Sequence, residues 1–150
     1  MTVRGINVKS LLFAGFVSGY LMYFIDKYFG GFLGLFGMFP GTDNLWWMIE
    51  HHIDSIIFAL AFAWPFVYLK LPGEGWFKGL GFGLIWTVAL TITSVIAGAL
   101  GSDIFKQMAK LSVSSAVNML VLHLVWGFFL GVLYQPPESI QRSFKPTVNR

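Results

Sequence analysis

Cysteine is absent from this sequence. Its absence excludes disulfide bonds, thiolate metal sites, covalently attached c-type haem and a cysteine nucleophile. Charged residues are also scarce, because Asp, Glu, Lys and Arg make up only 11% of the 150 residues, whereas a soluble domain carries about 25%. A soluble protein would need more charged residues than this on its surface. We therefore expect a single domain embedded in a membrane.

Motifs for catalysis or nucleic-acid binding are lacking as well. The formal charge is only +3 and the basic residues are scattered along the chain, so we expect no nucleic-acid partner. The sequence contains no nucleotide-binding loop, catalytic triad or recognisable metal motif. Its polar segments are too short to form a second domain. These features predict no catalytic residues and weigh against enzyme activity of this chain on its own.

Long apolar runs account for most of the chain, which is 56% hydrophobic. A membrane-spanning helix needs about 20 mostly apolar residues. The first run follows two basic residues, as a signal peptide would, but it continues to Asp26 without a small-x-small cleavage site, so we interpret it as a retained helix. The sequence predicts an all-α four-helix membrane bundle with a polar tail at 136–150. The expected spans are 10–28, 45–69, 77–100 and 112–135.

The distribution of basic residues predicts how the four helices are oriented. Lys and Arg accumulate on the cytoplasmic side of a membrane protein. The two ends of the chain and the second loop hold seven of them: Arg4, Lys9, Lys70, Lys78, Arg142, Lys145 and Arg150. The first and third loops hold three: Lys27, Lys106 and Lys110. We therefore expect a multi-pass protein of the cell (inner) membrane with both termini in the cytoplasm.

Spans two and four share a spacing of polar, small and aromatic residues. The shared positions are His51, Ser55, Ala59 and Phe62 in span two, and His123, Gly127, Gly131 and Tyr134 in span four. Spans one and three repeat a shorter pattern, with Gly15 and Gly19 in one and Gly79 and Gly83 in the other. Small residues four positions apart let any two membrane helices pack closely. The pattern therefore fits ordinary packing, and it also suggests a duplicated helical hairpin.

The segment VLHLVWGFFLGVLYQPP (121–137) contains the His-x-x-x-Gly-x-x-x-Gly-x-x-Tyr pattern of span four. It resembles the last helix of small four-span bacterial and archaeal membrane proteins of unknown function, the YagU-like type. The resemblance covers this helix and the general layout. It implies a four-helix fold and no activity, because that family has no settled activity.

Ionisable side chains at the start of span two are the most unusual feature of the sequence. Glu50, His51, His52 and Asp54 lie directly before the uncharged run IIFALAFAWPFVYL. On a helical wheel Glu50, His51 and Asp54 share one broad face, and His52 points about 100° away from His51. His123 is the lone histidine of span four. Ionisable residues inside a membrane span are costly, so these side chains are candidates for a functional site.

Several interpretations of these side chains remain open. In the first, His123 hydrogen-bonds a neighbouring helix, and Glu50 and Asp54 belong to a polar cluster near the headgroups. In the second, His52 and His123 hold a haem b between spans two and four. In the third, a non-haem iron, zinc or copper ion has nitrogen and oxygen ligands from Glu50, His51, Asp54 and His123. The handling of protons or ions is a fourth.

From these features we hypothesise a small accessory subunit of a larger membrane complex, respiratory or redox in type. Such a subunit would contact membrane lipids and larger membrane subunits, and it would hold a haem b or a metal ion or no cofactor at all. The alternative is a small homo-oligomeric transporter of ions, protons or a solute. In that case the polar residues of spans two and three would line the pathway.

Overall fold

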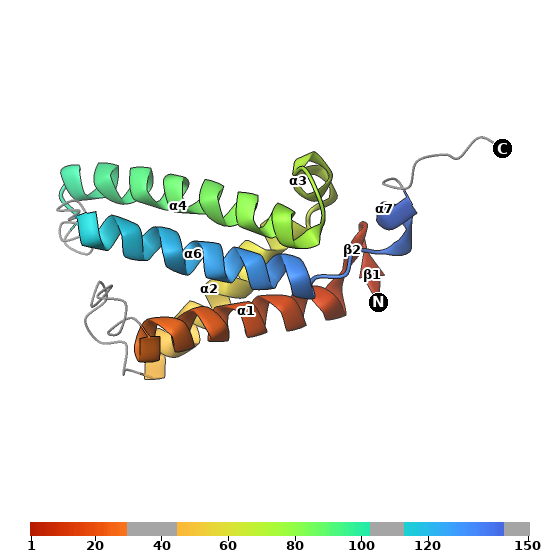
Figure 1. The fold of residues 1–150 in the computed structure, drawn as a ribbon, viewed down its shortest axis with the longest axis horizontal. Helices are drawn as coiled ribbons and strands as arrows, with labels where there is room; N and C mark the ends of the chain where they lie inside the picture. Colours follow the sequence, from red (N-terminus) through yellow and green to blue (C-terminus); the bar gives the residue numbers. More distant parts are fainter. Residues whose placement is uncertain (30–44, 103–112, 143–150) are drawn as a thin grey trace.

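Four long helices make up most of the protein. The structure, a computed structural model, describes residues 1–29, 45–102 and 113–142. The long helices are α1 (Val8–Phe29), α2 (Leu45–Ala63), α4 (Gly75–Ala99) and α6 (Val113–Leu133). Figure 1 shows α4 and α6 side by side, with α1 and α2 below and behind them. Both termini lie at one end of the bundle, which we call the terminal end, and we call the other end the opposite end.

Three of these helices are long and apolar enough to cross a membrane: α1, α4 and α6. This finding confirms the expected mostly helical, membrane-embedded protein. The fourth helix, α2, lies beside them, but Glu50 and Asp54 and two histidines interrupt its apolar surface. Four membrane crossings therefore remain a prediction. The first and third loops, at 30–44 and 103–112, lie outside the described residues.

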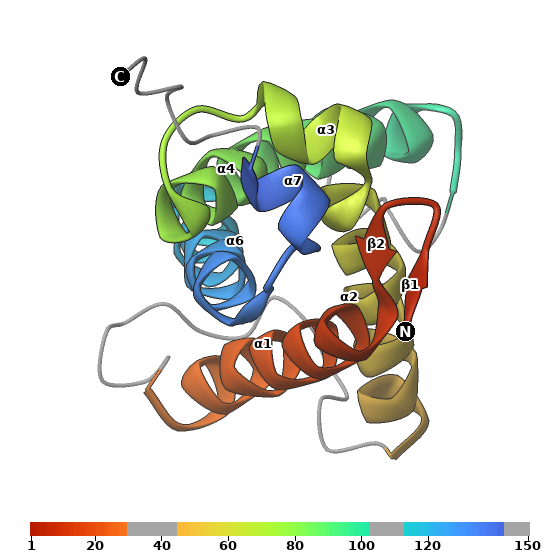
Figure 2. The same ribbon diagram turned by 90° about the vertical axis from the view of Figure 1, so that its right-hand side faces the viewer.

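The second expected span, 45–69, is wrong as a single helix. Helix α2 ends at Ala63, Trp64 has an extended backbone with ψ of 125°, and a short helix α3 (Pro65–Lys70) begins at the next residue. Proline has no N–H and its fixed φ suits the first position of a helix, so Pro65 starts a new helix instead of kinking the old one. Figure 2, viewed from the terminal end, shows α3 turned away from α2 across the top of the bundle.

An N-terminal β-hairpin corrects the expectation of a purely helical chain. Strands β1 (Thr2–Val3) and β2 (Ile6–Asn7) pair antiparallel. The two turn residues, Arg4 and Gly5, have φ of 48° and 80°, as the tightest hairpin turn requires. Asn7 then caps α1, because its Oδ1 accepts the N–H of Ser10 at 3.4 Å.

Backbone contact joins α4 to α6. A Cβ added to Gly79 would overlap the carbonyl oxygen of Gly127, and one added to Gly83 would overlap that of His123. Gly131 likewise faces the carbonyl of Gly75. Only glycine permits backbones to approach this closely in a helix pair. The glycines that recur every four residues in the sequence therefore form the contact surface of these two helices.

The small residues at the equivalent places of the sequence pattern also meet in the pair α1 and α2. A Cβ built on Gly15 would lie 3.1 Å from Ala59, and one on Gly19 would lie 2.6 Å from Ser55 Oγ. In α4 and α6 the positions with the same places in the sequence pattern also face each other, Gly79 against Gly131 and Gly83 against Gly127. The two hairpins therefore use equivalent positions for their internal contacts.

The two hairpins meet through aromatic rings and one buried hydrogen-bond chain. Phe62, fully buried, packs on Phe82 with ring centroids 5.3 Å apart. Trp126 of α6 donates its Nε1–H to Ser55 Oγ at 2.7 Å, and Ser55 donates in turn to the carbonyl of Gly15 at 2.6 Å. A single serine hydroxyl thus connects three helices, α1, α2 and α6.

Candidate functional site

Four polar side chains from three helices lie near one another in the half of the bundle toward the opposite end. They are Asp26 of α1, His51 of α2, and Asn118 and His123 of α6, and we call them the polar cluster. The carboxyl group of Asp26 lies beside the Asn118 amide and within electrostatic range of His51. His51 is in turn within electrostatic range of His123. The sequence predicted the two histidines, and the fold adds the carboxyl and the amide.

His51 connects α2 to α1. Its Nε2 lies 3.0 Å from the carbonyl oxygen of Gly19. A carbonyl accepts hydrogen bonds only, so Nε2 carries the proton and donates. This bond needs Gly19 to be small, because a side chain there would fill the space next to Ser55. The helix contact and the position of the imidazole therefore depend on each other.

Asp26 and Asn118 are the unsatisfied members of the polar cluster. Asn118 is 2% exposed. In the described part of the chain, neither Asp26 Oδ1 nor Asn118 Nδ2 has a hydrogen-bond partner, although both atoms are buried. The two side chains approach each other without reaching hydrogen-bond geometry. Buried polar atoms without partners are costly, so this site favours a bound proton, ion or water between them.

His123 keeps one ring nitrogen as an acceptor. Its Nδ1 donates to the carbonyl of Met119 one turn earlier, at 2.7 Å, and the residue is 8% exposed. With the proton on Nδ1, a neutral ring leaves Nε2 as a lone-pair acceptor. In one of our interpretations His123 bonds a neighbouring helix, whereas this bond is made within its own helix. The helix bond fixes the tautomer and leaves the other nitrogen available.

His52 belongs to a different surface of α2. Its Nδ1 also lies 2.7 Å from the carbonyl one turn earlier, that of Met48. Its ring packs against Phe16 and Tyr20 of α1, with centroids 5.0 and 6.2 Å away. His51 is the histidine whose charge acts on His123. His52 and His123, the pair expected for haem, both carry the ring proton on Nδ1. The ring of His52, however, is covered by side chains of α1.

Three of the four expected metal ligands lie near the start of α2. Asp54 is within electrostatic range of Glu50 and His51, and Glu50 is exposed. Among residues 1–29, 45–102 and 113–142, no three His, Asp or Glu side chains are grouped so that they would hold one metal ion. Glu50 and Asp54 form an acidic rim next to His51, and His123 lies beyond it on α6.

Sequence reasoning missed Asp26 and Asn118 as site residues. Asp26 comes near the end of the first expected span, 10–28, and we did not single it out from the sequence. Asn118 is the only asparagine of α6, in a run that is otherwise mostly apolar. A polar amide at that depth was the available signal, since polar residues inside membrane helices usually face a partner or a cavity. No family model, curated protein or solved structure matches this chain.

Proposed function

We propose that the polar cluster binds a proton or a small cation inside the membrane, and that the protein is a small homo-oligomeric ion or proton transporter. The observation that carries this proposal is the pair of buried, unsatisfied atoms, Asp26 Oδ1 and Asn118 Nδ2. A carboxylate and the free Nε2 of His123 are acceptors that suit a proton or a cation. Three helices hold these groups, so a change in helix packing would change their mutual distances.

The pathway would continue along α4, which packs against α6 at the backbone of His123. Thr87 and Ser94 of α4 are buried, at 8% and 2% exposure. Their hydroxyls provide buried polar atoms in a mostly apolar helix. One copy of this bundle encloses little space, so we place the complete pathway in an oligomer.

Ion flux into liposomes tests the proposal. The purified protein is reconstituted and the flux of protons, Na⁺ and K⁺ is followed with indicator dyes. We expect Asp26→Asn and Asn118→Leu each to reduce flux of the transported ion at least tenfold. Glu50→Gln is the matched control, because it removes an exposed carboxylate of the rim, and it should retain most of the flux. Flux equal to that of empty liposomes for all three ions would refute the proposal.

The accessory-subunit hypothesis remains a second candidate function because of the two histidine tautomers. His52 and His123 both use Nδ1 for a bond to their own helix, which leaves Nε2 as the nitrogen that haem iron requires. Gentle extraction from native membranes should then yield this chain together with larger redox subunits. A b-type reduced-minus-oxidised spectrum that His123→Leu weakens would support it. Extraction of this chain alone, without such a spectrum, would exclude it.

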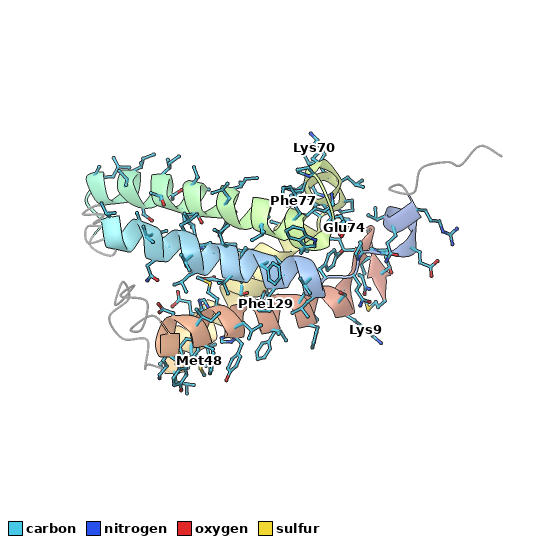
Figure 3. The ribbon with its side chains drawn as sticks, viewed as in Figure 1. Lys9, Met48, Lys70, Glu74, Phe77 and Phe129 are labelled. Atoms are coloured by element: carbon cyan, nitrogen blue, oxygen red, sulfur yellow. The ribbon has the colours of Figure 1, made fainter. Side chains whose placement is uncertain are left out.

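We further propose four membrane crossings with both termini in the cytoplasm. Lys9 and Lys70 lie at the terminal end and Met48 at the opposite end (Figure 3), in agreement with the positive-inside rule. Cysteines introduced at Asn44 and Ser102 should react with an impermeant label from outside, and one at Ser143 should not. Labelling of Ser143 alone would reverse the topology. The equivalent contacts in the two hairpins support our proposal of a duplicated hairpin, and the YagU-like resemblance stays a proposal of the same kind.

A further inference from the structure

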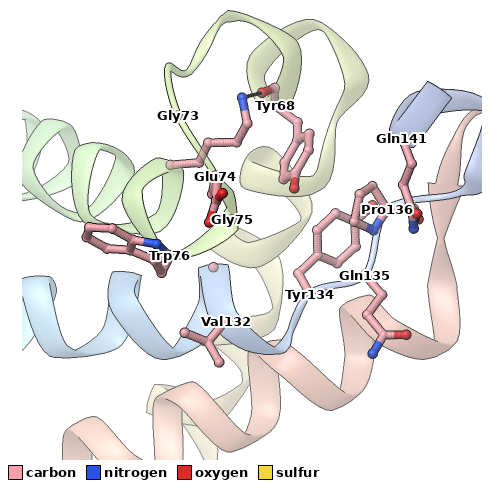
Figure 4. Close-up of a pocket in the computed structure, with 12 residues that line it drawn as sticks. Tyr68, Gly73, Glu74, Gly75, Trp76, Val132, Tyr134, Gln135, Pro136 and Gln141 are labelled. Carbon is pink, nitrogen blue, oxygen red and sulfur yellow. Dashed lines mark hydrogen bonds between the residues drawn. The ribbon is translucent and has the colours of Figure 1, made fainter. Parts of the chain in front are cut away.

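A pocket of about 710 Å³ lies at the terminal end, far from the polar cluster. It is formed where α3 and the start of α4 meet the end of α6 and the short helix α7 (Glu138–Arg142). Its volume is in the range of ordinary small-molecule sites. Figure 4 shows its main side chains. The residues that matter for its chemistry are Tyr68, Glu74, Trp76, Lys78 and Tyr134.

The pocket carries one charge of each sign. Lys78 is 3% exposed, and its ammonium group donates to the carbonyls of Tyr68, at 2.9 Å, and Leu71. Glu74 stands one turn before it, just ahead of α4, and is exposed. Its carboxylate does not cap the helix, and it makes no ion pair with any residue that the structure describes. The lining is therefore neutral overall, with its two charges at separate positions.

Aromatic rings and helix amides complete the lining. The rings of Tyr68 and Tyr134 meet edge to face, with centroids 5.6 Å apart, and Trp76 is 45% exposed at the side. Tyrosine and tryptophan faces attract ammonium groups, and both residues favour the membrane interface. The first N–H groups of α4 have no partner within the helix, and such groups attract phosphate.

We propose that this pocket binds the headgroup of a zwitterionic phospholipid, which carries a phosphate and an ammonium group. The phosphate would lie toward the first amides of α4 and Lys78, and the ammonium toward Glu74 and the tyrosine rings. A purely anionic headgroup would be repelled by Glu74, and a purely cationic one by Lys78. The exposed rings of Trp76 and Phe77, at 45% and 47%, lie next to the pocket and suit contact with acyl chains.

Native mass spectrometry of the full chain in detergent tests this proposal. The protein is mixed with phosphatidylethanolamine, phosphatidylcholine or phosphatidylglycerol, and the retained lipid is counted as the collision energy rises. We expect phosphatidylethanolamine to be retained at least fivefold better than phosphatidylglycerol. Glu74→Gln should remove this preference. The matched control Glu50→Gln makes the same charge change at the opposite end and should preserve it.

Three outcomes would overturn the proposal. The first is equal retention of all three lipids, and the second is an equal effect of Glu74→Gln and Glu50→Gln on the lipid preference. The third concerns the source of the headgroup: free glycerophosphoethanolamine is added as a competitor. If it binds as tightly as the intact lipid, the ligand is a soluble phosphodiester and the assignment to a lipid is wrong. Because Glu74 is exposed, its substitution tests recognition and leaves the packing of the helices unchanged.

Discussion

The two helical hairpins place small residues at equivalent positions, yet they pack in different ways. Between α4 and α6, glycines oppose backbone atoms, so the two main chains touch. Between α1 and α2, Gly15 and Gly19 oppose the side chains of Ala59 and Ser55. The second hairpin is therefore held by close backbone approach, and the first has room for a hydroxyl group.

That difference leaves room in the first hairpin for polar groups that bond from one of its helices to the other. Ser55 uses its room to bond both Gly15 and Trp126, and His51 bonds the backbone of the facing helix at Gly19. His123, at the position equivalent to His51, bonds its own helix. The first hairpin has Ser55 where the second has Gly127. This one difference gives the first hairpin a hydrogen-bonded helix contact and the second a contact made by packing. The following substitutions test this comparison, from the largest expected effect to the smallest.

Gly79→Ala should have the largest effect. The added methyl group would overlap the carbonyl of Gly127, and backbone atoms do not move aside as a side chain can. We expect a loss of about 3 kcal/mol in the free energy of unfolding, at the upper end of overpacking costs, measured by reversible denaturation in mixed micelles. Gly81→Ala is the control, because its Cβ would meet Leu71 at 3.9 Å, an ordinary contact. Equal stability of the two variants would show that α4 and α6 lie further apart than the structure places them.

Ser55→Ala should come next. It removes two buried hydrogen bonds and leaves the Trp126 Nε1–H without its acceptor. We expect a loss of about 2 kcal/mol, because an unsatisfied buried donor adds its desolvation cost. The double variant with Trp126→Phe should lose less than the two single losses added together, since both act on one bond. Strict additivity in the double-mutant cycle would mean that Ser55 and Trp126 do not share a bond.

Gly15→Ala should be milder than Gly79→Ala. Its Cβ would lie 3.1 Å from both the Ala59 methyl group and the Ile56 Cα. The neighbouring helix then needs to shift by only a few tenths of an ångström, so we expect a loss of about 1 kcal/mol. The same denaturation measurement compares the two variants directly. A loss as large as that of Gly79→Ala would remove the distinction between the hairpins.

Tyr134→Phe should have the smallest effect, and only in alkali. Tyr134 takes the position of Phe62 in the other hairpin, and burial raises the pKa of its hydroxyl to about 12, with smaller effects from the Asn7 backbone and Tyr68. Because the folded pKa is above the unfolded one, its contribution to stability is complete below pH ~10 and is lost as pH rises toward 12. We expect the melting temperature of the variant to fall less between pH 9 and 11. An identical fall in both proteins would contradict the raised pKa.

The long helices were predictable because their length follows from the membrane. The expected spans 77–100 and 112–135 differ from α4 and α6 by at most two residues at each end. The end of α2 was not predictable in this way. An internal proline either kinks a helix or starts a new one, and here the carbonyls at the end of α3 bind Lys78, a residue of the next helix. The β-hairpin was missed because each of its strands has two residues.

The polar cluster was predictable only in part. A histidine in an apolar run is conspicuous, so His51 and His123 were singled out from the sequence. Their grouping with Asp26 and Asn118 depends on how α1 and α6 are rotated about their axes. That rotation is set by the glycine contacts and by the Trp126 hydrogen bond to Ser55, which link residues far apart in the chain. Spacing within one helix carries no information about it.

The start of α1 and the end of α6 are bound to each other at the terminal end. Asn7 donates to the carbonyl of Gln135 at 3.1 Å, and the Ser10 hydroxyl accepts the N–H of Gln135 at 2.7 Å. The four long helices therefore form a nearly closed ring in chain order. A chain joined across these ends and opened between Leu71 and Gly75 would present the second hairpin first. Such a circular permutant should assemble the same bundle, because the chain order of the hairpins would change while every contact between them is kept.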